Sequence, residues 1–264
     1  MTKTPRELAF LRDLYITDDW TKRFTELANE HVKFGDAENL LYINAGTGTH
    51  CFEIRERVDD NTAVFALCED EHLLAIAQDK AVAVSSDVDF STMHFEDDAF
   101  DAVITDASLV PPSDIDETLR ESSRVARIGA DISVLTVTAG SFGEIFSLLW
   151  EVLLNEDLGE HGAVAEKMIS DLPSVSRLED LAAKAGYVNI HTHTSNEVFE
   201  YEDGAALISS PLVADLFMPQ WLESLSEDEV NNVLEKLGKL IDSERGSMSF
   251  RFSVKATLLT GEKS

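Results

Sequence analysis

Residues 40–48 read Leu-Leu-Tyr-Ile-Asn-Ala-Gly-Thr-Gly, an apolar run that ends in a loop with two glycines. The uninterrupted apolar residues from Leu40 predict a strand that is buried on both faces. Gly46 and Gly48 can adopt backbone conformations that other residues avoid, and they allow a ligand to approach the main chain closely. The stretch predicts a strand followed by a turn into a helix, and this turn is either a plain turn or a ligand-binding loop.

Apolar runs and helical patterns alternate on both sides of this stretch. Strands are predicted at residues 39–44, 63–68, 100–105, 131–137, 187–194 and 248–258. The last of these alternates apolar and polar residues, whereas the first four are continuous apolar runs. A helix is predicted over 113–127, and three capping boxes mark further helix starts, at Thr4/Glu7, Ser176/Glu179 and Ser226/Glu229. Continuous strands separated by helices predict an α/β fold with a mostly parallel sheet covered on both faces.

The composition excludes several classes of partner. The chain has 264 residues, with 21 Lys+Arg against 50 Asp+Glu and a formal net charge of −29. Such a surface repels phosphate backbones and anionic membranes, so we expect neither nucleic acid nor membrane as a partner, but a small molecule. The first ten residues are polar and no run approaches the ~18 apolar residues of a membrane span. We therefore expect a cytoplasmic protein.

Metal and disulfide chemistry have little support in the sequence. Cys51 and Cys68 form neither a disulfide framework nor a zinc-ligand spacing, and both are predicted to be small buried residues. His191 and His193 fall on one face of a predicted strand, which a metal ion could use, but no third ligand is evident. We expect no metal site.

Five segments in order resemble the class I S-adenosylmethionine-dependent methyltransferases. Residues 40–48 resemble the family's first motif, V-L-D-I-G-C-G-T-G, and residues 65–81 resemble its second strand and the helix after it. The other three segments are 89–95, similar to D-A-x-x-L-P-F, 100–103, similar to F-D-x-V, and 119–129, similar to L-x-E-x-x-R-V-L-K-P-G. The resemblance implies a Rossmann-like sheet of seven strands with an antiparallel final strand. It also implies methyl transfer from S-adenosylmethionine to a small-molecule acceptor by in-line displacement.

The resemblance also implies a domain layout. We expect residues 1–264 to form a single methyltransferase-like domain, with an N-terminal helical cap at 1–36 and a cofactor-binding core at 37–150. Residues 195–245 are irregular and rich in aromatic residues and carboxylates, and this composition is typical of a lid over a substrate site.

Site residues follow from the same alignment. The loop residues would cradle the methionine portion of the cofactor: Asn44, Ala45, Gly46, Thr47 and Gly48. Cys68 and Glu69 stand where the family binds the ribose, Asp89 and Phe90 where it binds the adenine, and Thr105 ends a strand beside the loop. Asp106 and His94 are the candidate catalytic residues, as a base or as groups that orient the nucleophile. The plain alternatives are a solvated turn for Glu69, a helix cap for Asp106 and a solvent-facing ring for His94.

Three departures from the family pattern leave other hypotheses open. Tyr42 replaces an acidic residue, Asn44 replaces a glycine, and Cys68 replaces the carboxylate that usually accepts the ribose hydroxyls. A second hypothesis is therefore a methyltransferase-like scaffold or binding protein with reduced or lost cofactor binding. It predicts that Asp at positions 42 and 68, with Gly at 44, would raise cofactor affinity. A third, an NAD-dependent oxidoreductase, rests on Gly46, Gly48 and Glu69 alone, because Cys51 occupies the third glycine position of the dinucleotide motif.

Overall fold

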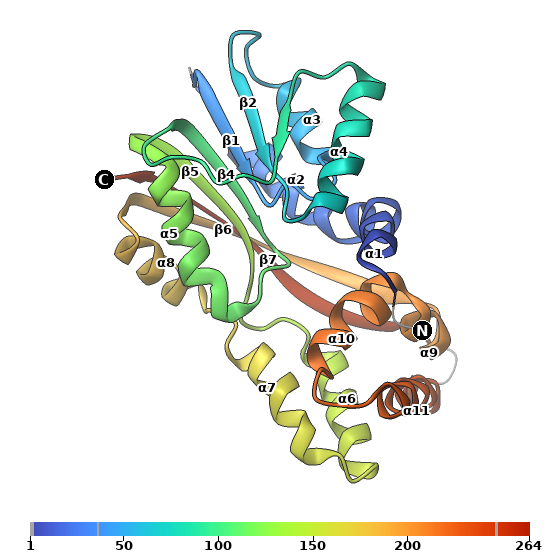
Figure 1. The fold of residues 1–264 in the computed structure, drawn as a ribbon. Coiled ribbons are helices and arrows are strands. Elements are labelled where there is room, and N and C mark those ends of the chain that lie inside the picture. Colours follow the sequence, from blue (N-terminus) through green and yellow to red (C-terminus); the bar gives the residue numbers. More distant parts are fainter. Residues whose placement is uncertain (1–2, 36, 246–247) are drawn as a thin grey trace. The chain divides into compact units, whose positions relative to one another are not determined.

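The computed structural model describes residues 3–35, 37–245 and 248–264 (Figure 1). Its chain forms two compact units. The first unit comprises Met1–Val137, Ser174–Ser195 and Ala256–Ser264, and the second comprises Thr138–Pro173 and Asn196–Lys255. The expected single domain with a cap, a core and a lid stays a prediction. The expected cap and the glycine loop both belong to the first unit, and the expected lid belongs to the second apart from Ser195.

The strands form one seven-stranded sheet, in which neighbouring strands follow the order β3-β2-β1-β4-β5-β7-β6. Its strands are β1 (Asn39–Ile43), β2 (Ala63–Leu67), β3 (Asp89–Ser91), β4 (Phe100–Ala107), β5 (Ala126–Thr138), β6 (Tyr187–Tyr201) and β7 (Phe250–Lys263). The pairs β1–β2, β1–β4, β2–β3 and β4–β5 are parallel. β7 is antiparallel to β5 and to β6. The predicted Rossmann-like sheet, mostly parallel with an antiparallel final strand, is confirmed.

The register of the parallel strands brings three strand ends to one edge. Ile43 of β1 lies opposite Leu67 of β2 on one side and opposite Thr105 of β4 on the other. The residues that follow β1 and β2, and the last residues of β4, therefore meet at the carboxyl edge of the sheet. In open α/β sheets this edge is where ligands bind.

Helices cover both faces of the sheet in the first unit. Its helical segments are α1 (Pro5–Leu11), η1 (Arg12–Thr21), α2 (Lys22–His31), α3 (Thr49–Arg55), α4 (Glu71–Val84), η2 (Pro112–Asp114), α5 (Ile115–Val125) and α8 (Val175–Lys184). α5 and α8 lie on one side of the strands, and α3 and α4 lie on the other (Figure 1). Leu41, Val103, Leu119, Ile132 and Leu178 belong to one buried cluster between the sheet and α5 and α8. Burial of such side chains contributes about 1.5–3 kcal/mol each.

The second unit has its own apolar core. Its helical segments are α6 (Gly143–Asn155), η3 (Gly159–His161), α7 (Gly162–Ser170), α9 (Gly204–Ser209), η4 (Leu212–Phe217), α10 (Met218–Trp221) and α11 (Glu227–Arg245). Phe142 packs edge-on against Phe217 and Trp221, which are stacked on each other at 5.4 Å between ring centroids. The aromatic residues of the expected lid are therefore largely core residues of this unit.

Several local predictions are confirmed and others need correction. The capping boxes at Thr4/Glu7 and Ser226/Glu229 both form. The third is wrong, because Ser174 caps α8 and Ser176 lies inside the helix. The short strand β3 and the π-helical form of η1 were not predicted, since three residues carry no periodicity and a π-helix has no distinctive sequence pattern. Within the described part of the chain, no helix combines the length and apolarity that a membrane crossing requires.

Candidate functional site

The loop after β1 is held in a strained, well-bonded conformation. Asn44, Gly46 and Gly48 have φ angles of 58°, 56° and 80°. Asn tolerates this left-handed region better than most side chains do, so Asn44 can replace the family's glycine without losing the turn. Its side-chain amide donates to the Asp106 carbonyl oxygen at 3.1 Å, and this bond joins the loop to the end of β4.

Two side chains pack directly on the loop glycines. A Cβ atom on Gly48 would lie 2.6 Å from the Phe90 ring, and one on Gly46 would lie 3.1 Å from the Arg12 guanidinium. Phe90 is 6% exposed and its ring also meets Phe52 edge-on, with centroids 5.5 Å apart. Only glycine fits at Gly48, because the ring that supports the loop occupies the space of a side chain.

Arg12 and Glu69 form an ion pair across the loop. Arg12 Nη2 lies 2.5 Å from Glu69 Oε1, and the two side chains are 18% and 27% exposed. The other Glu69 oxygen accepts a hydrogen bond from the Gly46 amide at 3.0 Å. Burial tends to lower the pKa of the Arg12 guanidinium, but the carboxylates of Glu69 and Asp106 outweigh it and the net shift is upward. Arg12 therefore carries its charge within this site.

A second ion pair links Asp13, the residue after Arg12, to Lys80. Lys80 Nζ lies 2.7 Å from Asp13 Oδ1 and donates to the Thr49 hydroxyl at 2.7 Å. Thr49 is the first residue of α3, directly after Gly48. Arg12 and Asp13, consecutive residues at the start of η1, are thus linked to the loop region indirectly, Arg12 through Glu69 to Gly46 and Asp13 through Lys80 to Thr49.

The space enclosed by these groups is small. The cavity there has a volume of only about 10 Å³, roughly the room for one water molecule. It is lined by Arg12, Thr17, Thr21, Tyr42, Asn44, Ala45, Gly46, Thr47, Thr49, His50 and Asp106. Donors and acceptors that could bind a nucleotide-like ligand line this cavity, and the Arg12 guanidinium lies over Gly46.

Asp106 is a buried carboxylate at the edge of this cavity. It is 5% exposed, and its Oδ1 accepts from the Ser108 amide at 2.9 Å. Burial raises the pKa of Asp106, although the hydrogen bonds from Ser108 and the charge of Arg12 partly oppose this. The Ser108 hydroxyl accepts in turn from Trp20 Nε1 at 3.0 Å, so η1 also reaches the end of β4.

Tyr42 begins a chain of hydrogen bonds that leads from a buried strand to the exposed side chain of Arg57. Its hydroxyl lies 3.0 Å from His50 Nδ1, and His50 Nε2 lies 3.2 Å from Asn29 Oδ1. The Arg57 guanidinium donates to both the side-chain and the main-chain oxygen of Asn29. Burial raises the pKa of Tyr42 well above 10, and Asp106 adds to the shift, so the phenol stays neutral. At the position where the family has an acidic residue, this protein therefore has a neutral phenol that is hydrogen-bonded to His50.

Acid is expected to destabilise the protein through His50. Burial, helped by the charge of Arg57, lowers its pKa from 6.5 to about 3. Because the folded pKa lies below the unfolded one, the unfolded chain binds the proton first, and stability present above pH 6.5 is lost as the pH falls toward 3. Between pH 7 and pH 5 the free energy of unfolding should decrease by about 2 kcal/mol more than in a His50→Gln variant.

Urea unfolding at each pH measures this difference. The comparison uses the pH slope, so a constant offset from the lost Tyr42 and Asn29 bonds does not affect it. Equal slopes for the two proteins would show that His50 does not titrate between its folded and unfolded states in this way.

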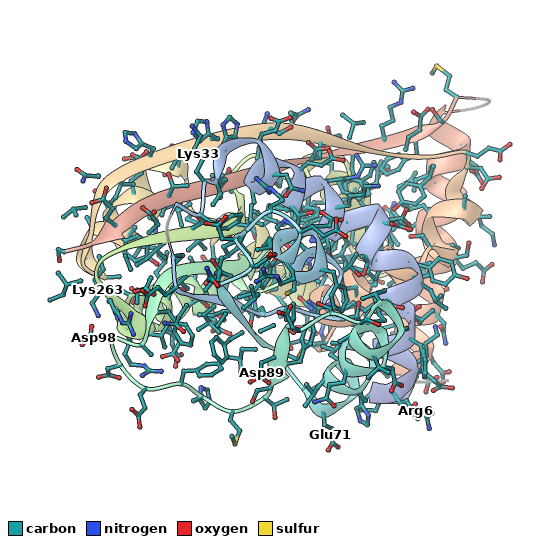
Figure 2. The ribbon with its side chains drawn as sticks, turned by 90° about the horizontal axis from the view of Figure 1, so that it is seen from above. Arg6, Lys33, Glu71, Asp89, Asp98 and Lys263 are labelled. Carbon is teal, nitrogen blue, oxygen red and sulfur yellow. The ribbon has the colours of Figure 1, made fainter. Side chains whose placement is uncertain are left out.

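The other expected site residues are placed outside this cavity. Cys68 is buried, burial raises its pKa to about 12, and its amide donates to the Ser91 carbonyl. The Thr105 hydroxyl pairs with Ser122 of α5 at 2.7 Å. Asp89 lies at the surface (Figure 2). The His94 side chain is 85% exposed, with Nδ1 3.9 Å from Glu121 Oε1. Arg12, Lys80 and the Tyr42–His50 chain were missed, because no motif in the sequence relates the N-terminal segment to the loop.

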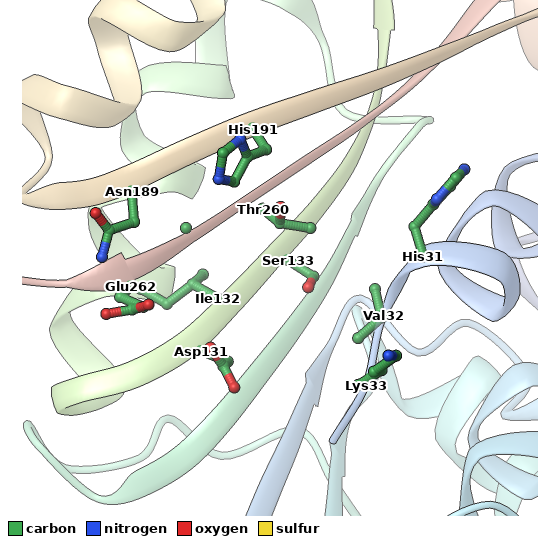
Figure 3. Close-up of a pocket in the computed structure, with 11 residues that line it drawn as sticks. His31, Val32, Lys33, Asp131, Ile132, Ser133, Asn189, His191, Thr260 and Glu262 are labelled. Atoms are coloured by element: carbon green, nitrogen blue, oxygen red, sulfur yellow. The ribbon is translucent and has the colours of Figure 1, made fainter. Parts of the chain in front are cut away.

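A second, open groove lies on the face of β5, β6 and β7 near the end of α2 (Figure 3). Its volume is about 300 Å³, and exposed polar residues such as Lys33, Asp131 and His191 line it. His193 stacks on His31 at 3.7 Å between ring centroids rather than pairing with His191. Across residues 3–35, 37–245 and 248–264, no group of three or more His, Cys, Asp or Glu could hold a metal ion.

The sheet order, the glycine loop at its carboxyl edge and the acidic residue after β2 define a class I S-adenosylmethionine-dependent methyltransferase. The model of the ubiE/COQ5 methyltransferase family matches residues 12–198, and the chain belongs to this family. Methyl transfer from S-adenosylmethionine is accordingly its reaction class, and the scaffold and NAD hypotheses are not favoured.

One curated relative and two solved structures illustrate what the chain is similar to. The ubiquinone/menaquinone biosynthesis C-methyltransferase UbiE of Xanthomonas oryzae pv. oryzae is 28% identical over 198 residues, which cover 69% of this chain and 76% of the relative. The YcgJ protein of Bacillus subtilis has a similar structure, with a TM-score of 0.58, 14% identity, and coverage of 92% of this chain and 98% of that one.

Phosphoethanolamine N-methyltransferase 2 of Haemonchus contortus, in complex with phosphomonomethylethanolamine and S-adenosylhomocysteine, has a TM-score of 0.54 at 14% identity. The match covers 99% of this chain and 59% of that protein. At such identities the two solved structures support the fold alone.

Proposed function

We propose that this methyltransferase methylates a carbon atom of a small neutral ring such as a quinol or another phenol. Three observations support this acceptor. The relatives from Xanthomonas are named as C-methyltransferases of quinone biosynthesis. The net charge of −29 disfavours anionic acceptors. The carboxylate of Asp106 lies beside the glycine loop, where a proton lost from an acceptor carbon could be received.

The chemistry of the loop residues fits S-adenosylmethionine. When bound, this cofactor supplies an electrophilic methyl group on a sulfonium ion. The methionine portion would lie along Asn44, Ala45, Gly46, Thr47 and Gly48, where the two glycines allow close approach to the backbone. Glu69 would accept the ribose hydroxyls beside Cys68. Asp89 would accept the adenine amine, with Phe90 supporting the loop beneath, and Thr105 would fix the end of β4 through Ser122.

Asp106 carries the catalytic part of the proposal. Its burial and its position at the lining of the cavity suit a group that orients the acceptor and takes up the proton released when carbon gains the methyl group. The raised pKa of Asp106 brings the carboxylate nearer to the range in which a base works at neutral pH. His94 is the second candidate base, and its 85% exposed side chain makes it the weaker one.

The Asp106→Asn variant separates binding from chemistry. We expect S-adenosylhomocysteine, titrated by isothermal calorimetry, to bind the variant within about 3-fold of the parent protein. Methyl transfer to a soluble short-chain quinol should fall about 10²- to 10⁴-fold, because a positioned general base contributes rate factors of that size. The measurement is the product formed per unit time under saturating methyl donor.

Asp98→Asn serves as the matched control, since Asp98 is an exposed carboxylate that pairs with Lys263 at the surface (Figure 2). Its methyl transfer should equal that of the parent protein. If neither S-adenosylmethionine nor S-adenosylhomocysteine binds the parent protein at millimolar concentration, the cofactor assignment is wrong and the scaffold hypothesis regains support.

Location and the substrate cover belong to the same proposal. Both cysteines are free and buried, which suits the reducing cytoplasm that we propose as the location. Residues 195–245 are the proposed cover of the acceptor on the carboxylates of that range, because its aromatic residues are largely buried.

A further inference from the structure

The residues 12–21 that form η1 are here named the strap. Three bonds hold it over the carboxyl edge of β1, β2 and β4: Arg12 to Glu69 at 2.5 Å, Asp13 to Lys80 at 2.7 Å, and Trp20 to Ser108 at 3.0 Å. Two of the three are made by the first two residues of the strap. The glycine loop is therefore covered at the point where the amino-acid end of the cofactor would lie.

The carboxylate of Glu69 occupies an anion site. It is bonded at one oxygen by a guanidinium and at the other by the Gly46 amide. A guanidinium and a backbone N–H together recognise carboxylates, and arginine does so with directional, charge-assisted bonds. Glu69 fills this site from within the protein, and the cavity lined by Arg12 has room for about one water molecule.

S-adenosylmethionine carries one group that can bind Arg12 and another that can bind Glu69. Its amino-acid portion carries one carboxylate, which matches Arg12, and its ribose carries two hydroxyl donors, which match a carboxylate acceptor such as Glu69. A partly buried guanidinium among Glu69, Asp106 and Asp70 needs an anionic partner at all times, because an unpaired buried charge is costly. Exchange of one carboxylate for another keeps Arg12 paired throughout.

We propose that Arg12 is a cofactor-binding residue that works by partner exchange: it releases Glu69 and binds the carboxylate of the cofactor's amino-acid portion, while the freed Glu69 turns to the ribose. This inference rests on the proposed function and adds to it a specificity residue outside every recognised motif. The strap then closes over the amino-acid end of the ligand, with Asp13 and Trp20 keeping their anchors.

Two nucleosides distinguish this role from a purely structural one. S-adenosylhomocysteine carries the carboxylate, and 5′-methylthioadenosine has the same nucleoside without the amino acid. Isothermal calorimetry with the Arg12→Gln variant should show affinity for S-adenosylhomocysteine lowered about 10- to 100-fold, the loss of a charge-assisted hydrogen bond. Affinity for 5′-methylthioadenosine should change by less than about 3-fold.

Arg6→Gln is the matched control, because Arg6 lies in α1, is exposed, and contacts Phe10 rather than the loop. It makes the same change of net charge and should alter neither affinity. Arg12→Lys, which keeps the charge but not the fork of donors, should bind S-adenosylhomocysteine with intermediate affinity and replaces Arg12→Gln if that variant does not fold.

Three outcomes would overturn the proposal. Equal losses for both nucleosides in Arg12→Gln would show a structural role, and an unchanged or tighter affinity for S-adenosylhomocysteine would show that Arg12 only blocks the site. Failure of the parent protein to bind either nucleoside would overturn the proposed function, and the exchange with it.

Discussion

Replacing Tyr42 by Asp should lower the free energy of unfolding by about 3–5 kcal/mol, although Asp is the residue typical of this motif. Tyr42 is 2% exposed, its hydroxyl is bonded to His50, and both Asp106 and Glu69 raise its pKa through their charges. An aspartate there would leave the space of the ring empty and place a third carboxylate beside two others. Urea unfolding monitored by circular dichroism measures the change.

Tyr42→Phe is the control for this substitution. It keeps the ring and removes only the bond to His50 Nδ1, so we expect a loss of about 1–2 kcal/mol. An equal loss for Phe and Asp would show that the hydroxyl alone matters, and an Asp variant as stable as the parent protein would contradict the argument. The restored set of Asp at positions 42 and 68 with Gly at 44, predicted to raise cofactor affinity if the scaffold hypothesis holds, should therefore be tested with its stability measured alongside its affinity.

Replacing Gly48 by Ala should destabilise the protein by roughly 2–5 kcal/mol. Two effects add. A left-handed conformation at φ +80° costs an L-residue about 1–2 kcal/mol, and a Cβ atom only 2.6 Å from the Phe90 ring forces a shift that costs about 1–3 kcal/mol. Because the glycine loop moves with this shift, S-adenosylhomocysteine should also bind more weakly. Thermal or urea unfolding, together with calorimetric titration, measures both results.

The chain offers a close control for the backbone effect. Gly129 has a φ of +79°, and a Cβ atom there would meet nothing within 4 Å. Gly129→Ala should therefore cost only the 1–2 kcal/mol of the backbone conformation. Phe90→Leu in the Gly48→Ala background should recover part of the loss. If Gly48→Ala and Gly129→Ala destabilise equally, the contact with Phe90 does not restrict the loop.

The sequence predicted the central strands of the sheet well because β1 and β4 are buried on both faces. The run from Leu40 to Ile43 is apolar throughout, and a short continuous apolar run is typical of a buried strand. The largely apolar runs before Cys68 and after Phe100 gave the same signal. The ends were less accurate. β5 begins at Ala126 rather than Asp131. Its first five residues mix two buried alanines with exposed Arg127, Ile128 and Gly129, so they form no continuous apolar run that distinguishes a strand from a loop.

The site was only partly predictable. The conformation of the loop followed from its glycines, and Asn44 could be recognised as a substitute because Asn tolerates positive φ. Arg12 could not be recognised, because its role depends on the position of the strap over Gly46, and no local pattern encodes that approach. Thr105 shows the opposite case: it ends the right strand, yet its hydroxyl is used by Ser122.

The strap also makes the site sensitive to chain length. Arg12 starts the ten-residue η1, its carbonyl accepts from the Thr17 hydroxyl, and Trp20 near the other end is anchored on Ser108. Each helical residue advances the side-chain direction by roughly a quarter turn. Deletion of one residue between Arg12 and Trp20 would thus point the guanidinium away from Glu69 while every bonding residue was still present. Among related sequences, this segment should tolerate many substitutions but few changes of length.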